Sequence, residues 1–154
     1  MEDRDYMRIA LELAREAAAE GEVPVGCVIT RGGEIVGRGR NRREEKQSAL
    51  SHAELEAIRD ACEKTGSWRL HGCTLYVTLE PCPMCGGAIL HARIPRVICG
   101  AADPVAGAMG SVWALHRHPV ESKHTKVEMG CLEEECKEIL QSFFRNRRDP
   151  SREP

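Results

Sequence analysis

Residues 73–93 read CTLYVTLEPCPMCGGAILHAR, and this stretch predicts three consecutive elements. Its first part, 73–79, is rich in β-branched and aromatic residues, which predicts a buried strand. Residues 83–93 have helical spacing and predict a helix. The PCPMC motif at 81–85 joins the two. The sequence therefore predicts a strand, a short turn that carries two cysteines, and a helix.

On either side of this unit, the hydrophobic pattern predicts the rest of one mixed sheet. Glycines in the segment 31–33 supply the positive backbone angles of a tight turn, so the two apolar runs around it predict a hairpin. The polar, aperiodic segment 41–50 predicts a loop. The expected helices span 3–20, 51–64, 83–93 and 132–148, and the expected strands span 23–30, 34–40, 73–79, 96–101 and 125–129. This alternation favours an α/β fold of three layers, with helices on both faces of a central mixed sheet of about five strands.

Length and composition bound the class of protein. The 154 residues, 42% hydrophobic and 30% charged, are typical of one globular domain over 1–154, with a frayed tail at 149–154. The net charge of −2 argues against nonspecific coating of nucleic acid. The acidic start lacks the features of a signal peptide, no stretch approaches a membrane span, and eight cysteines are too few for a secreted disulfide scaffold. We therefore expect a cytoplasmic protein with reduced thiols and no membrane partner.

Two motifs hold the residues that can carry chemistry, HAE at 52–54 and PCPMC at 81–85. Cys82 and Cys85 are three residues apart, so both sulfurs project from one face of a helical turn. The N–H groups at a helix N-terminus favour thiolates, the form that binds metal. His52 offers a third ligand. Structural zinc sites are usually closed by four protein ligands, so a set of three predicts one catalytic zinc per chain.

Glu54 is the candidate catalytic residue, because a carboxylate there can take a proton from zinc-bound water and return it to the substrate. Two alternatives remain open for these motifs taken singly. Ser51 and Glu54 fit a capping box, which satisfies helix N–H groups without chemistry. The C-x-x-C pair fits a redox pair, or a zinc ribbon with two further ligands. Together, H-x-E and P-C-x-x-C after a strand form the motif of zinc-dependent nucleobase deaminases.

The sequence resembles the bacterial tRNA-specific adenosine deaminases, in the cytidine deaminase-like superfamily, from about Met7 to Arg148. The resemblance is carried by EVPVGCVI at 22–29, Asn41, HAE at 52–54, TLYVTLEPCPMCGGAILHARI at 74–94, the stretch 107–111 and SFFRNRR at 142–148. It implies the cytidine deaminase-like fold. It also implies a homodimer that binds the tRNA anticodon loop at its interface.

The resemblance assigns roles to individual residues as well. It implies zinc ligands at His52, Cys82 and Cys85, and a proton shuttle at Glu54. It implies substrate contacts from Asn41, from the backbone N–H of Ala53 and from Val28 in the pocket wall. For RNA it points to Asp103, Arg147 and Arg148; the same arginines also suit a helix end, where they complement the helix dipole.

The chain departs from the family pattern in the loops expected to face the substrate. Two residues after Asp103 the family usually has a lysine suited to a phosphate, and this chain has Val105. The family's Asn-His pair is Lys123-His124 here, and AMGSVWAL at 108–115 is unusual. These changes leave the expected chemistry intact and bear on the substrate.

We therefore expect hydrolytic conversion of the wobble adenosine of a tRNA to inosine. The bases of an anticodon loop are already unpaired, so extruding one of them costs little. One alternative is a deaminase of a free base or nucleotide, such as guanine or cytosine, with the same centre. Another is a structural zinc module that binds RNA through its basic tail. Inosine formation in tRNA would indicate the tRNA deaminase, and ammonia release from free bases would indicate the small-molecule enzyme. Neither activity would indicate the structural zinc module.

Overall fold

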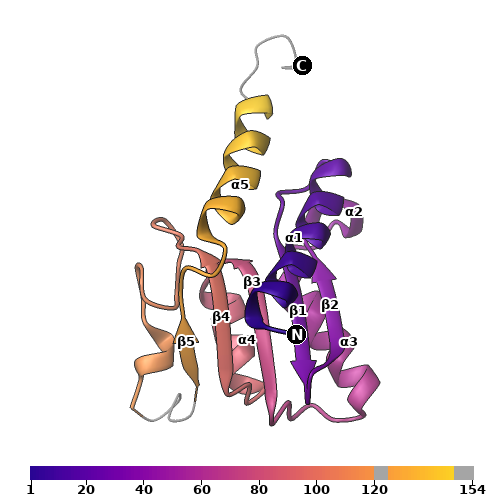
Figure 1. Ribbon diagram of the computed structural model, residues 1–154, viewed down its shortest axis with the longest axis vertical. Coiled ribbons are helices and arrows are strands. Elements are labelled where there is room, and N and C mark those ends of the chain that lie inside the picture. Colours follow the sequence, from indigo (N-terminus) through magenta and orange to yellow (C-terminus); the bar gives the residue numbers. More distant parts are fainter. Residues whose placement is uncertain (120–124, 148–154) are drawn as a thin grey trace.

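A five-stranded mixed sheet lies at the centre of the molecule (Figure 1). The computed structural model describes residues 1–119 and 125–147. Its strands are β1 (Gly26–Arg31), β2 (Glu34–Arg40), β3 (Cys73–Leu79), β4 (Arg96–Ala101) and β5 (Lys126–Glu128), in the order β2-β1-β3-β4-β5. β1 is antiparallel to both of its neighbours, whereas β3, β4 and β5 are parallel to one another. The carboxyl ends of these three strands therefore meet at one edge of the sheet, where α/β folds place their sites.

Helices cover both faces of the sheet, which confirms the predicted three-layer α/β/α architecture (Figure 1). The helices are α1 (Asp3–Ala19), α2 (Arg43–Lys46), α3 (Ala53–Thr65), α4 (Pro83–His91), the short 3₁₀ helix η1 (Leu115–Arg117) and α5 (Glu133–Arg147). α1 and the first turns of α5 pack on one face, and α3 and α4 pack on the other. No helix within the described ranges is long and apolar enough to cross a membrane.

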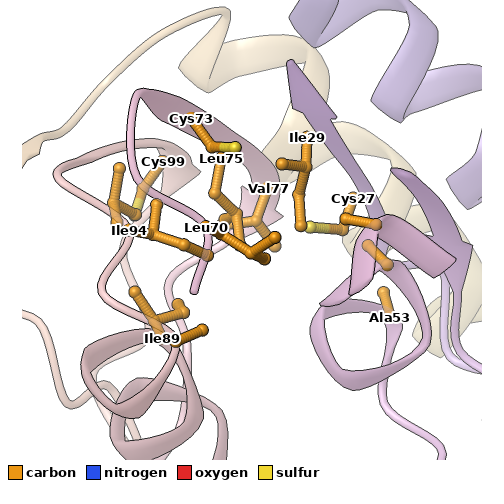
Figure 2. Close-up of a cluster of buried hydrophobic side chains, with 14 of the residues drawn as sticks. Cys27, Ile29, Ala53, Leu70, Cys73, Leu75, Val77, Ile89, Ile94 and Cys99 are labelled. Carbon is orange, nitrogen blue, oxygen red and sulfur yellow. The ribbon is translucent and has the colours of Figure 1, made fainter. Parts of the chain in front are cut away.

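The period of two along β1 divides its side chains between the two cores. Cys27 and Ile29 face α3 and α4, and Figure 2 shows them beside Leu75 and Val77 of β3 in that cluster. Val28, between them, faces α1 and packs in the other cluster. The central strands β1 and β3 are thus buried on both faces, as their continuous apolar sequences predict.

Glycines let α3 approach the sheet closely enough to set the position of its first turn. A Cβ atom on Gly39 of β2 would overlap the carbonyl oxygen of Ala53, and one on Gly37 would overlap that of Ala57. α3 also bonds to the outer edge of β2 at one residue, because Asp60 accepts a hydrogen bond of 2.9 Å from the N–H of Arg38. The start of α3 is therefore held against β2.

The structure corrects two boundaries that the sequence predicts. β1 begins at Gly26 and not at residue 23, because Val23 and Val25 form a turn closed by a hydrogen bond of 2.9 Å. The predicted loop 41–50 contains the short helix α2. Glu22 explains this helix, since its buried carboxylate accepts hydrogen bonds from two N–H groups at the helix start, at 3.1 and 2.8 Å.

Candidate active site

Three metal-ligand side chains come together at the N-terminal ends of α3 and α4. His52 is the residue that precedes α3, Cys82 precedes α4, and Cys85 lies in the first turn of α4. Nδ1 of His52 lies 3.7 Å from Sγ of Cys82 and 3.5 Å from Sγ of Cys85. A further His, Cys, Asp or Glu does not join this group within the described part of the chain. The predicted ligand set is therefore assembled in space, although 30 residues separate His52 from Cys82.

The spacing of these atoms fits a tetrahedral ion. Zn–S bonds of about 2.3 Å and Zn–N bonds of about 2.1 Å place sulfur and nitrogen roughly 3.6 Å apart. Hydrogen bonding from Cys85 lowers the pKa of Cys82 to about 3, so this sulfur is a thiolate at neutral pH. That same hydrogen bond, together with burial, raises the pKa of Cys85 while the two sulfurs share one proton. Two sulfurs and one imidazole are the donor set that zinc prefers, with one position left open.

Glu54 lies beside these ligands, 4% exposed, in the first turn of α3. Burial raises the pKa of its carboxyl group to about 7, the value that suits a group exchanging protons at neutral pH. The capping-box alternative is wrong, because α3 begins at Ala53 and its cap residue, His52, makes no side-chain cap hydrogen bond. The buried carboxylate is therefore available for chemistry.

A cavity of about 230 Å³ opens onto Glu54 and two of the ligands. It is smaller than the roughly 300–1,000 Å³ of a drug-sized site, which suits a single base. Of the residues predicted to bind substrate or RNA, the cavity wall includes Asn41, Ala53 and Asp103. The lining residues that sequence reasoning missed are Val23, Val25, Arg43, Leu79, Glu80 and Ala106.

The side chain of Asn41 is held in a fixed orientation at this wall. Its Oδ1 accepts a hydrogen bond from the N–H of Arg43, and its Nδ2 donates one to the carbonyl oxygen of Val23, both at 3.3 Å. The NH2 group keeps a second N–H and the carbonyl oxygen a second lone pair, so the amide can bind a further partner in the cavity.

The structure does not bring the remaining predicted site residues to the cavity. Val28, expected in the pocket wall, lies on the opposite face of the sheet because of the alternation along β1, and Val25 lines the cavity in its place. Arg147, at the end of α5, donates a hydrogen bond of 2.6 Å to the carbonyl oxygen of Gly21 and stacks on Phe143. Arg148, predicted to contact RNA, lies outside the described residues, and so does the Lys123-His124 pair that departs from the family pattern.

Glu80 is the lining residue with the clearest sequence signal that was missed. It is an acidic residue between an apolar strand and Cys82, the first cysteine of the ligand set, and it is 2% exposed. Burial acts to raise its pKa, but hydrogen bonds from the loop 103–111 outweigh burial and lower it. Glu80 is therefore ionised and bonded to the chain, whereas Glu54 is poised to exchange a proton.

Three candidate metal ligands beside a buried carboxylate, on this three-layer fold, are typical of a deaminase of the cytidine deaminase-like fold. The family model of the MafB19-like deaminases matches residues 1–148. A tRNA-specific adenosine deaminase from Bacillus subtilis (strain 168) is 45% identical over 147 residues, which cover 96% of this chain and 91% of that protein. The chain belongs to the family of tRNA-specific adenosine deaminases.

Solved structures agree with this assignment. A tRNA deaminase studied for A-to-I editing at the wobble position of transfer RNA aligns with a TM-score of 0.85 and 43% identity, over 88% of this chain and 99% of that chain. A guanine deaminase from Nitrosomonas europaea aligns with a TM-score of 0.75 and 24% identity, over 89% of this chain and 81% of that one. The second likeness concerns the fold alone.

Proposed function

We propose that this chain converts the wobble adenosine of a tRNA to inosine and releases ammonia. The observation that carries the proposal is the buried carboxylate of Glu54 beside His52, Cys82 and Cys85 in a cavity for one base. Curated relatives at 44–45% identity are tRNA-specific adenosine deaminases, which supports adenosine in tRNA as the substrate. A free base such as guanine is the competing substrate class.

One zinc ion per chain, held by His52, Cys82 and Cys85, would supply a water molecule activated for attack on the amino-bearing ring carbon. Glu54 takes a proton from the attacking water and delivers it to a ring nitrogen, and the second proton goes to the departing amine. The oxygen stays on the ring as the carbonyl of inosine, and ammonia leaves. Asn41 and the backbone N–H of Ala53 hold the edge of the base.

The wider assembly follows from the same proposal. We propose that residues 1–154 act as one deaminase domain in the cytoplasm, as a homodimer that binds the anticodon loop at its interface. Asp103 contacts the RNA at the cavity, and Arg147 and Arg148 contact its phosphates. Arg147 lies on α5, which extends beyond the sheet from the edge where the parallel strands end (Figure 1).

The test is to incubate the protein with a transcribed tRNA that carries a wobble adenosine and to measure inosine at that position. A transcript with guanosine there is the matched control. Free guanine and cytosine, assayed for ammonia release, cover the competing class. Ammonia release from a free base with no inosine in the tRNA would reject the proposal, whereas zinc binding without either activity would indicate a structural zinc module.

A further inference from the structure

The carboxylate of Glu80 is buried outside the catalytic group and bonded to one loop of the cavity wall, residues 103–111. Its Oε1 accepts hydrogen bonds from the N–H of Asp103 at 3.1 Å and the hydroxyl of Ser111 at 2.5 Å. Its Oε2 accepts from the N–H of Met109 at 2.9 Å and the N–H of Ser111 at 3.1 Å. Each oxygen therefore accepts two hydrogen bonds, which uses the full capacity of the carboxylate.

The 103–111 loop is shaped to close on this carboxylate. A Cβ atom on Gly107 would overlap the carboxyl group of Glu80 and crowd the carbonyl oxygen of Asp103, so only glycine allows the approach. The N–H of Ala108 donates a hydrogen bond of 2.8 Å to the carbonyl oxygen of Pro81, the residue after Glu80. The segment 80–81 thus holds the loop at both its start and its end.

The loop reaches the cavity through Asp103 and Ala106, which line it. The groups that would perform the chemistry lie elsewhere, with Glu54 and His52 at the start of α3 and the cysteines at the start of α4. We propose that Glu80 is a positioning residue, which holds the 103–111 loop in the conformation that captures the RNA substrate; this role rests on the proposed function. A displaced loop would therefore weaken substrate capture more than turnover of substrate already bound.

Two substitutions test this from opposite sides of the contact. Glu80→Gln keeps the size of the side chain but replaces an accepting oxygen with an NH2 group, which meets N–H donors of the loop. Gly107→Ala leaves the carboxylate intact and pushes the loop away from it. For both variants of the full chain, we expect KM for an anticodon stem-loop to rise about tenfold, because loss of one substrate hydrogen bond weakens binding by about that factor and binding that is equal in the ground and transition states affects KM alone. We expect kcat to change by less than about threefold.

Asp3→Asn is the matched control for a loss of stability. Asp3 also accepts hydrogen bonds from several donors, Tyr76 and Arg96 among them, but it lies outside the lining of the cavity. We expect this variant to lower the melting temperature with KM unchanged. A KM that rises equally in Asp3→Asn would show a global effect and overturn the role of Glu80.

Amide hydrogen exchange gives a readout that needs no substrate. In Glu80→Gln, the N–H groups of Met109 and Ser111 should exchange at least about tenfold faster, while amides in β3 keep their protection. Unchanged exchange at both positions, or an unchanged KM in both loop variants of an active enzyme, would overturn the proposal. Wild-type protein that forms no inosine in tRNA would instead reject the proposed function, and the exchange result would still report whether Glu80 holds the loop.

Discussion

His52 and Glu54 of the HAE motif reach the same site, although they lie two residues apart in the chain. His52 ends the extended segment before α3 and presents its ring to the two sulfurs, while Glu54 is carried into the cavity by the first helical turn. Residues two apart on a continuing helix would point in different directions. Because His52 precedes the helix, the two side chains reach one site.

Glu54→Gln separates chemistry from structure at this position. The amide keeps the size of the side chain but cannot take a proton, so turnover should fall by about 10² to 10⁴, the range for a positioned acid or base. Zinc content and melting temperature should stay close to wild type. Inosine formation in tRNA, metal analysis and thermal unfolding measure the three quantities, and near-normal turnover would rule out proton transfer by Glu54.

Cys85→Ala tests the metal centre. Removing one of three ligands should lower zinc content well below one per chain, and with it the melting temperature, since metal binding is coupled to folding. The matched control is Cys73→Ala, because Cys73 is buried in the core away from the ligand group. Full zinc occupancy in Cys85→Ala would contradict the ligand assignment.

Among the secondary structure elements, α3 depends on its contact with β2, and Gly39→Ala tests this dependence. The added methyl group would overlap the backbone of α3 at Ala53, so we expect a loss of about 1–3 kcal/mol in the free energy of unfolding, as in other overpacked cores. Activity should fall as well, because Ala53 adjoins His52 and Glu54. Urea unfolding gives the first quantity. Gly87→Ala is the matched control, because Gly87 also lacks a positive φ and an added Cβ there would meet no atom within 4 Å, so this variant should not lose stability.

Local sequence predicts most of the strands and helices, because the spacing of apolar residues and the glycines of tight turns are both seen within a few residues of the chain. It predicts the ligand set too, since the H-x-E and P-C-x-x-C motifs each lie within one turn. It does not predict α2, because the group that stabilises this helix is Glu22, which lies more than 20 residues away in the chain and contacts it only after folding. The position of Val28 depends on distant residues as well, because the packing of α1 and α3 on the sheet decides which face of β1 each side chain joins.

At the scale of the whole molecule, Asp3 ties the first helix to the far strands. It accepts hydrogen bonds of 3.0 and 2.6 Å from Arg96 of β4, which also pairs with Glu128 of β5. Hydrogen bonding with Arg96 lowers the pKa of Asp3, so its contribution to stability is present above the unfolded pKa near 3.9 and is lost as the pH falls through the lower folded value.

Asp3→Asn tests this contribution, when the free energy of unfolding of wild type and variant is measured in urea at several pH values. At pH 7 we expect wild type to be more stable by about 0.5–1 kcal/mol, a modest value because the side chains are more than a third exposed. The difference should shrink as the pH falls below about 4 and should disappear below the lower folded pKa, where Asp3 is protonated in both states. A difference that stays constant down to pH 2 would contradict this.

Contacts with RNA are expected at two places on the surface, the end of α5 and the loop that contains Val105. Arg147→Ala should weaken binding of an anticodon stem-loop and flatten its salt dependence by about one unit of slope. Val105 is 82% exposed beside Asp103, so Val105→Lys should tighten binding and steepen the slope by a similar amount. Affinities at several salt concentrations measure both effects, and indifference to salt in all three proteins would reject phosphate contacts at these positions.

The hydrogen bond between Asp60 and the N–H of Arg38, at the outer edge of β2, bears on contacts between separate molecules. An outer strand with free N–H and C=O groups is a template on which another chain can add a strand and begin an aggregate. In β2, the carboxylate of Asp60 occupies the N–H of Arg38, and the exposed side chain of Arg38 places a positive charge on the strand. The hydrogen bond that joins α3 to the outer edge of β2 therefore also makes this part of the strand a poorer template for a strand from another copy.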